Sequence, residues 1–250
     1  MPKPAPSDGV GVPADVFVME QRGSKVVFGP GTRLGRALLE LAPAEAGPTL
    51  LVARTDKERG ILAARWPAAK VSSREEPDPQ GLERADSLAI HVCALGPIHP
   101  AMSADAADWA GDAAGVASDL DLLARLLRAS SGRPVHVVFV SSVLALASGR
   151  RRRYYAGWKC LIEATVERML DGYPRARMSV LYPGRLVESR SPMRPASLLH
   201  GRYPDLAARM IAIAASERGS RRLFGPDARL WLMSMGLRGA FAAIRPTLSD

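Results

Sequence analysis

Tyr155 and Lys159 lie four residues apart in the stretch GRRRRYYAGWKC, at residues 149–160. On a helix this spacing places both side chains on one face, whereas Tyr154 is five residues from Lys159 and points away. A nearby ammonium group stabilises tyrosinate and lowers the pKa of a tyrosine, which is about 10 in a free peptide. Such a tyrosine can donate a proton to a carbonyl oxygen or accept one from an alcohol. The pair therefore indicates acid–base chemistry, with an exposed helical pair as the alternative.

A serine at the end of an apolar run extends this set. Ser142 closes the run at residues 134–142 and precedes Tyr155 by thirteen residues. Ligands of open α/β sheets bind beyond the carboxyl ends of the strands. The Ser142 hydroxyl could therefore hold the same oxygen atom on which Tyr155 acts. Ser142, Tyr155 and Lys159 are the candidate catalytic residues.

A glycine-rich turn, GPGTRLG, follows the apolar run at residues 24–28 and precedes a helical pattern. This is the layout of a dinucleotide site, in which the backbone approaches the pyrophosphate and the helix N-terminus favours the anion. The spacing matches neither G-x-G-x-x-G nor a P-loop, so a tight turn without a ligand stays open. The candidate cofactor-binding residues here are Gly29, Gly31, Thr32, Arg33, Leu34 and Gly35.

Arg54 stands directly after the second apolar run, at residues 48–53. In a dinucleotide-binding fold this position lies beside the adenosine ribose, where an acid binds the 2′-hydroxyl and a base accommodates a 2′-phosphate. Neither Arg54 nor Thr55 is acidic, although Asp56 follows closely. We therefore expect NADP(H) in preference to NAD(H), with a solvated surface arginine as the alternative.

Apolar runs alternate with helical patterns along the chain, and the runs are continuously apolar, as in strands buried on both faces of a parallel sheet. The sequence predicts one α/β domain at residues 23–226, with a Rossmann-type doubly wound parallel sheet and helices on both faces. A flexible tail at 1–22 and an amphipathic C-terminal segment at 227–250 flank it. The expected strands are 24–28, 48–53, 69–72, 87–94, 134–142, 177–182 and 223–224, and the expected helices are 36–42, 57–66, 105–130, 155–170 and 205–216.

The chain is basic, with 34 lysines and arginines against 25 acidic residues and a net charge of +9. Such a charge favours contact with phosphates, anionic lipid or nucleic acid. The hypothesis of a nucleic-acid binder rests on charge alone, because no recognised motif supports it. We expect neither a nucleic-acid partner nor a metal site. The two cysteines form no disulfide framework, and no run has the length of a signal peptide or a membrane span. We expect a cytoplasmic protein.

Taken together, these motifs resemble the short-chain dehydrogenase/reductase family over residues 24–226. The resemblance implies hydride transfer between NAD(P)(H) and a carbonyl/alcohol pair. It makes Tyr155 the proton donor and Ser142 the residue that polarises the carbonyl, while Lys159 tunes Tyr155 and binds the nicotinamide ribose. It also implies a homo-oligomer that associates through the helix carrying Tyr155 and the long preceding helix. Further cofactor contacts implied by the resemblance are Ala94, Gly96, Pro183 and Gly184.

The chain departs from the family pattern at four places. Arg33 stands where the turn usually has a glycine, and Cys93-Ala-Leu-Gly96 replaces Asn-Asn-Ala-Gly. Ala114 stands where a helix asparagine is expected, and Glu188 follows Pro-Gly in place of a threonine. A non-catalytic protein that keeps the fold and binds NADP(H), with a regulatory or scaffold role, is therefore an alternative.

Four arginines, Arg150, Arg151, Arg152 and Arg153, separate Ser142 from Tyr155. If both ends of this loop are catalytic, the loop borders the cleft, where guanidinium groups can grip a substrate phosphate. A solvated loop is the alternative. Within the family, the pattern looks most similar to reductases related to the decaprenylphosphoryl-2-keto-ribose reductase, which implies a phosphorylated or lipid-linked sugar as substrate.

The segment FGPDARLWLMSMGLRGAFAAIRP near the C-terminus combines apolar residues with arginines. Such a segment can lie in a membrane interface, which would make the protein peripheral to the inner face of the membrane. It can equally pack over the substrate cleft or a subunit interface. Gly236 and Gly239 weaken a continuous helix here.

Overall fold

A computed structural model of the chain describes residues 23–44, 47–74, 82, 85–96, 106–130, 132–149, 152–189, 195–216 and 218–244. Seven strands form the central sheet, in the order β3-β2-β1-β4-β5-β6-β9, and every neighbouring pair is parallel. The strands are β1 (Ser24–Phe28), β2 (Thr49–Ala53), β3 (Lys70–Ser73), β4 (Leu88–Val92), β5 (Val135–Val140), β6 (Ala176–Pro183) and β9 (Arg221–Phe224).

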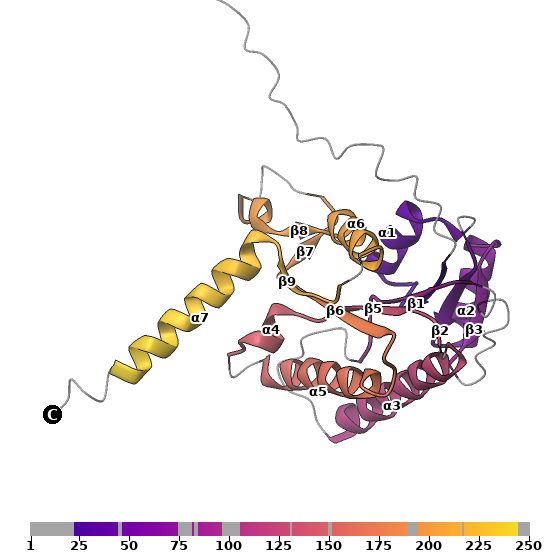
Figure 1. Cartoon of the computed structure of the whole chain (residues 1–250). Helices are drawn as coiled ribbons and strands as arrows, with labels where there is room; N and C mark the ends of the chain where they lie inside the picture. The colour runs from indigo at the N-terminus through magenta and orange to yellow at the C-terminus, as the bar shows by residue number, and fades with distance from the viewer. Residues whose placement is uncertain are drawn as a thin grey trace, which may run out of the picture.

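Helices cover both faces of this sheet, as Figure 1 shows with α1 and α6 on one side and α3 and α5 on the other. The predicted Rossmann-type doubly wound architecture is therefore confirmed. A two-stranded sheet of β7 (Leu186–Val187) and β8 (Gly201–Arg202) lies beside it. The helices are α1 (Arg33–Leu41), α2 (Asp56–Arg65), α3 (Ala106–Ala129), α4 (Val143–Leu146), α5 (Arg153–Leu170), the 3-10 helix η4 (Pro195–Leu199), α6 (Tyr203–Ala214) and α7 (Pro226–Ile244).

The core consists of two apolar layers, one on each face of the sheet. Strands β2 and β5 are buried along their whole length, which explains why they are continuously apolar. Leu38 of α1 and Met210 of α6 pack on one face, whereas Leu126 of α3 and Ile162 of α5 pack on the other. The layers fix the carboxyl edge of the sheet, where β1 and β4 diverge into helices on opposite faces.

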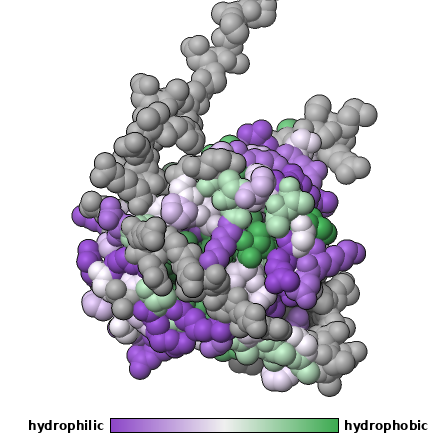
Figure 2. Space-filling model, turned by 90° about the vertical axis from the view of Figure 1, so that its right-hand side faces the viewer, coloured by the Kyte–Doolittle hydropathy of each residue, from purple (hydrophilic) through white to green (hydrophobic). Residues whose placement is uncertain are grey.

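One edge of the sheet is short and polar. Strand β3 has the sequence Lys-Val-Ser-Ser and forms this edge beside β2. Figure 2 views the molecule from this side, where hydrophilic residues surround small apolar patches. A short polar edge strand limits pairing with other chains.

Several local elements differ from the sequence-based expectation. Helix α5 begins at Arg153, two residues before the predicted start, and β9 begins at Arg221 instead of 223. The short elements α4, β7, β8 and η4 were not predicted, because they are too short for a periodic pattern. The predicted tail at 1–22 lies outside the described residues.

Helix α7 continues through Gly236 and Gly239, contrary to the expected weakening. Two helical glycines cost about 1 kcal/mol each, and the surrounding leucine, methionine and alanine residues are strong helix formers. In Figure 1 this helix runs away from the rest of the molecule. None of the helices in the described part of the chain has the length and hydropathy needed to span a membrane.

Candidate active site

A cleft of about 950 Å³ opens at the carboxyl edge of the sheet. The glycine turn forms one part of its wall. The ends of β4, β5 and β6, the starts of α4, α5, α6 and α7, and strand β7 form the rest. The cleft therefore unites motifs that are far apart in sequence. The predicted residues that line it are Gly31, Thr32, Arg33, Leu34, Ala94, Ser142, Arg152, Tyr155, Lys159, Pro183 and Gly184.

Other predicted residues lie beside the cleft and not in its wall. Gly29 and Gly35 shape the turn, Gly96 shapes the end of β4, and Arg54 lies at the side of β2. Arg153 is exposed at the start of α5, and Arg150 and Arg151 lie outside the described residues.

Helix α5 places Tyr155 and Lys159 side by side, as their spacing predicts. Both are buried, and Lys159 Nζ lies 5.6 Å from the centroid of the Tyr155 ring. The ammonium group donates a hydrogen bond to Leu95 O at 3.0 Å, which anchors it at the end of β4. Tyr154 points elsewhere, because its hydroxyl donates to Asp112 Oδ2 on α3 at 2.8 Å. The spacing therefore selects the correct tyrosine for the cleft.

The pKa values of the pair are set mainly by burial. Burial raises the pKa of Tyr155, and a hydrogen bond with Ser142 acts in the opposite direction. The expected lowering of the Tyr155 pKa is wrong for this geometry, because loss of water outweighs the stabilisation of tyrosinate. Burial, followed by the positive charge of Arg54, lowers the pKa of Lys159 to about 8.

Two adjacent serines follow β5 at the floor of the cleft. Ser142 is the N-cap of α4, and its Oγ accepts a hydrogen bond from Leu144 N at 3.3 Å. Ser141 also lines the cleft, and its buried Oγ has no partner among the residues described. Ser141 was not predicted as a site residue, although the Ser-Ser pair at a strand end was a visible signal.

Close backbone approach explains two glycines of the turn. Gly29 has a φ of 72°, and a Cβ atom there would lie 2.7 Å from Ala94 Cβ. A Cβ atom on Gly35 would lie 2.3 Å from Gly29 O, closer than real Cβ contacts allow. Thr32 caps α1 by accepting from Gly35 N at 3.0 Å, a contact worth about 1 kcal/mol. The turn thus directs the N-terminus of α1 toward the cleft.

Helix α3 lacks a polar group where the family pattern has asparagine. Ala114, at the expected position, is exposed and does not line the cleft. Val116 is the α3 residue closest to the Gly96 turn, since a Cβ atom on Gly96 would lie 3.2 Å from its Cγ2. Neither Ala114 nor Val116 carries an amide side chain.

The root of α7 closes one end of the cleft. Trp231 Nε1 donates to Ala147 O at 2.8 Å, and its ring packs against Leu144, Tyr155 and Ala156. Asp227 Oδ2 accepts from Arg185 N at 2.7 Å, which ties α7 to the turn after Pro183-Gly184. These contacts settle the alternatives for the first turns of α7, which pack over the cleft. Sequence patterns did not single out Trp231 or Asp227 as cleft residues.

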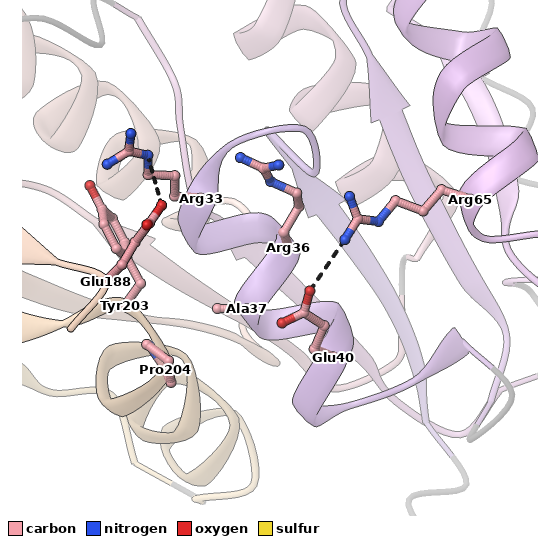
Figure 3. A pocket seen from close by; sticks show the side chains of 8 residues that line it. All are labelled: Arg33, Arg36, Ala37, Glu40, Arg65, Glu188, Tyr203 and Pro204. Carbon is pink, nitrogen blue, oxygen red and sulfur yellow. Dashed lines mark hydrogen bonds and ion pairs between the residues drawn. The ribbon is translucent and has the colours of Figure 1, made fainter.

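A smaller pocket of about 250 Å³ adjoins the cleft along the outer face of α1 (Figure 3). Arg33, in the position of a family glycine, pairs with Glu188 at 3.2 Å, so two departures from the family pattern contact each other. Arg65 pairs with Glu40 at 3.3 Å on the other side of the pocket. Arg36 lies between these pairs, and Arg33 and Arg36 line both the pocket and the main cleft.

The residues present fit a nicotinamide dinucleotide. The glycine turn offers a helix N-terminus to a pyrophosphate. The unpartnered hydroxyl of Ser141, together with Ser142, Tyr155 and Lys159, offers polar groups at the other end. The cleft is also large enough for a small ligand next to these groups.

Comparison of the sequence with models of known families and with curated proteins gives no match. Solved structures do match. A short-chain dehydrogenase from Streptomyces avermitilis gives a TM-score of 0.60 at 18% identity, covering 90% of this chain and 96% of that one. This chain has the short-chain dehydrogenase/reductase fold. The resemblance inferred from the sequence is thereby confirmed at the level of the fold.

Other structures with this fold contain nicotinamide cofactors. A FolM alternative dihydrofolate reductase 1 from Brucella suis, in complex with NADP, gives a TM-score of 0.64 at 17% identity, covering 84% of this chain and 96% of that one. A 3-ketoacyl-(acyl-carrier-protein) reductase from Brucella melitensis, complexed with NADH, gives 0.63 at 14% identity, covering 82% and 97%. The short-chain dehydrogenase/reductase fold thus accommodates both dinucleotides.

Proposed function

We propose that this protein is an NAD(P)(H)-dependent oxidoreductase that interconverts a carbonyl and an alcohol. The observation that carries the proposal is the convergence of Ser142, Tyr155 and Lys159 with the glycine turn in one cleft. Any one of these features is common by itself. Their union at the carboxyl edge of a doubly wound sheet supports a redox site.

Each residue of the set has a distinct role in this reaction. The nicotinamide, when bound, supplies or accepts the hydride. Tyr155 donates a proton to the carbonyl oxygen, which Ser142 holds by a hydrogen bond. Lys159 then stabilises the tyrosinate through its charge. Burial raises the pKa of Tyr155, so the phenol is protonated at neutral pH and holds the proton that carbonyl reduction consumes.

We expect NADP(H) to be preferred over NAD(H). Arg54 at the end of β2 and the absence of an acid at Thr55 support this preference. The NADP in the Brucella suis structure is consistent with this preference. The NADH in the Brucella melitensis structure indicates that the fold accepts both dinucleotides.

The cleft supports a substrate with a phosphate group and an apolar part, such as a phosphorylated or lipid-linked sugar. Arg152 and Arg185 line the cleft and could bind a phosphate. Trp231 gives an apolar wall beside Tyr155. The exposed side chains of Leu230, Met233 and Leu237 on α7 support a peripheral membrane contact that would deliver a lipid-linked substrate.

Two further proposals concern assembly and compartment. We expect a homo-oligomer that associates through α3 and α5, where Trp109 and Leu161 are exposed. We expect a cytoplasmic location, because Cys93 and Cys160 are free thiols, as in a reducing compartment.

Replacing Tyr155 with phenylalanine tests the proposed chemistry. The variant lacks the proton donor, so we expect reduction of carbonyl compounds to fall by roughly 1,000-fold while NADPH still binds. Tyr154→Phe is the matched control, because it removes the same hydroxyl from a residue outside the cleft, and it should keep full turnover. Turnover that survives in Tyr155→Phe would rule out the assigned role.

Ala114, which stands in place of the family's helix asparagine, favours a second candidate, a protein that binds NADP(H) without turnover and acts as a regulator or scaffold. Tight NADPH binding combined with no activity toward a broad panel of carbonyl compounds would support this alternative.

A further inference from the structure

A buried ion cluster lies at the adenosine end of the carboxyl edge. Asp119 on α3 has only 2% of its side chain exposed. Arg74, directly after β3, reaches it with two nitrogens: Nε lies 2.6 Å from Oδ1, and Nη2 donates to Oδ2 at 2.7 Å. The Nη2 contact is a charge-assisted hydrogen bond, whereas the Nε contact is a close ion pair without hydrogen-bond geometry. Asp119 therefore has one cation firmly bound.

Arg54 is the second cation of the cluster, and it is bound much more loosely. Its Nη2 lies 3.9 Å from Asp119 Oδ2 and donates to Ala94 O at 3.4 Å, both at the long end for such contacts. The guanidinium therefore reaches from the end of β2 past β1 to the end of β4. It does not point outward from the end of β2, where the adenosine ribose is expected.

A second carboxylate contacts Arg54 through its backbone amide. Glu58 Oε2 accepts a hydrogen bond from Arg54 N at 2.7 Å. Its Oε1 covers Gly31, because a Cβ atom on Gly31 would lie 2.6 Å from it. Two cations thus face two anions, Asp119 and Glu58. A phosphate that enters has to compete with Asp119 for Arg54, the cation with the longer contacts.

We infer that Asp119 is a positioning residue that sets the selectivity between NADP(H) and NAD(H) by competing with the 2′-phosphate for Arg54. The loose contact lets Arg54 leave, and Arg74 keeps Asp119 from becoming an unpaired buried charge. NAD(H) has no 2′-phosphate and therefore does not need Arg54 to move. This inference rests on the proposed function, because it assumes that the cleft binds a nicotinamide dinucleotide.

Asp119→Asn tests the competition. Dissociation constants for NADPH and NADH are measured by fluorescence titration, without any substrate. Without the carboxylate, Arg54 is released to the phosphate, so we expect NADPH to bind about tenfold more tightly relative to NADH. Asp121→Asn removes the same charge from an exposed position of the same helix, and its NADPH/NADH ratio should match that of the unmodified protein.

Two further variants test the same competition if thermal melting shows that Asp119→Asn folds poorly. Arg74→Gln leaves Asp119 with Arg54 alone, so the preference for NADPH should fall, opposite in sign to Asp119→Asn. In an Arg54→Ala background, Asp119→Asn should have no effect on the ratio. A merely structural role for Asp119 would not produce opposite shifts or this dependence on Arg54.

The outcomes separate the two proposals. If the unmodified protein binds both dinucleotides but the ratio is unchanged in Asp119→Asn and Arg74→Gln, the role of Asp119 is overturned while the proposed function stands. The role of Asp119 is also overturned, and the proposed function stands, if Asp121→Asn shifts the NADPH/NADH ratio as much as Asp119→Asn does. If the unmodified protein binds neither dinucleotide, both proposals fail.

Discussion

At the scale of single residues, Lys159 connects Tyr155 with the end of β4. Its ammonium group lies over the Tyr155 ring and donates to Leu95 O, and burial with the charge of Arg54 lowers its pKa to about 8. Lys159 is therefore charged below about pH 8 and neutral above it. The charge is what stabilises the tyrosinate that forms when Tyr155 gives up its proton.

We predict that carbonyl reduction declines as the pH rises through about 8, because Lys159 loses its positive charge there. The rate constant kcat/KM, measured between pH 6 and pH 10, should show this alkaline decline. In Lys159→Met the decline should disappear and the remaining rate should be roughly 100-fold lower. An unchanged decline in Lys159→Met would assign it to another group.

Residue spacing identified the candidate catalytic set, because the helical repeat alone relates Tyr155 to Lys159. It did not identify Ser141, Trp231 or Asp119. Ser141 needed the strand end in three dimensions, and Trp231 needed the direction in which α7 leaves β9. Asp119 belongs to no motif, and its partner Arg74 lies 45 residues earlier in the chain. Such long-range contacts leave no local pattern in the sequence.

At the scale of secondary-structure elements, helix α7 has one part that contacts the cleft and one part that is exposed. Its first turns contact the cleft wall through Asp227 and Trp231, whereas Met233 and Leu237 farther along the helix are exposed. The hydrophobic character of this segment was evident from the sequence, but its division into a cleft part and an exposed part was not.

We predict that Trp231→Ala raises KM about tenfold with little change in kcat, because the substrate loses an apolar wall and not a reacting group. Met233→Ala is the control, since Met233 is exposed on the same helix and does not line the cleft. Steady-state kinetics of both variants make the comparison. An equal change in both, or an unchanged KM in Trp231→Ala, would remove Trp231 from the substrate site.

At the scale of the whole molecule, the sequence predicts the fold more completely than it predicts the site. Continuously apolar runs separated by helical patterns permit few arrangements other than a parallel sheet covered on both faces. A further feature of the whole molecule is the exposed apolar side chains of α3 and α5, Trp109 and Leu161. Exposed large apolar side chains on neighbouring helices are typical of subunit interfaces.

We predict that Leu161→Glu reduces the molar mass in solution from an oligomer to a monomer, because a buried glutamate would be unpaired in the interface. Light scattering coupled to size-exclusion chromatography measures this mass. Ile61→Glu is the control, since Ile61 is equally exposed on α2, on the other face of the sheet. A monomeric unmodified protein, or an oligomer that survives Leu161→Glu, would contradict the assigned interface.

Hydride transfer itself is tested most directly with NADPH that carries deuterium at both hydrogen positions of nicotinamide C4. The protein is incubated with this cofactor and a panel of carbonyl compounds, and the alcohols formed are analysed by mass spectrometry. We expect deuterium on the carbinol carbon of a product with the unmodified protein and with Tyr154→Phe, and none with Tyr155→Phe. Binding of the labelled NADPH without transfer to any compound of the panel would contradict an oxidoreductase function.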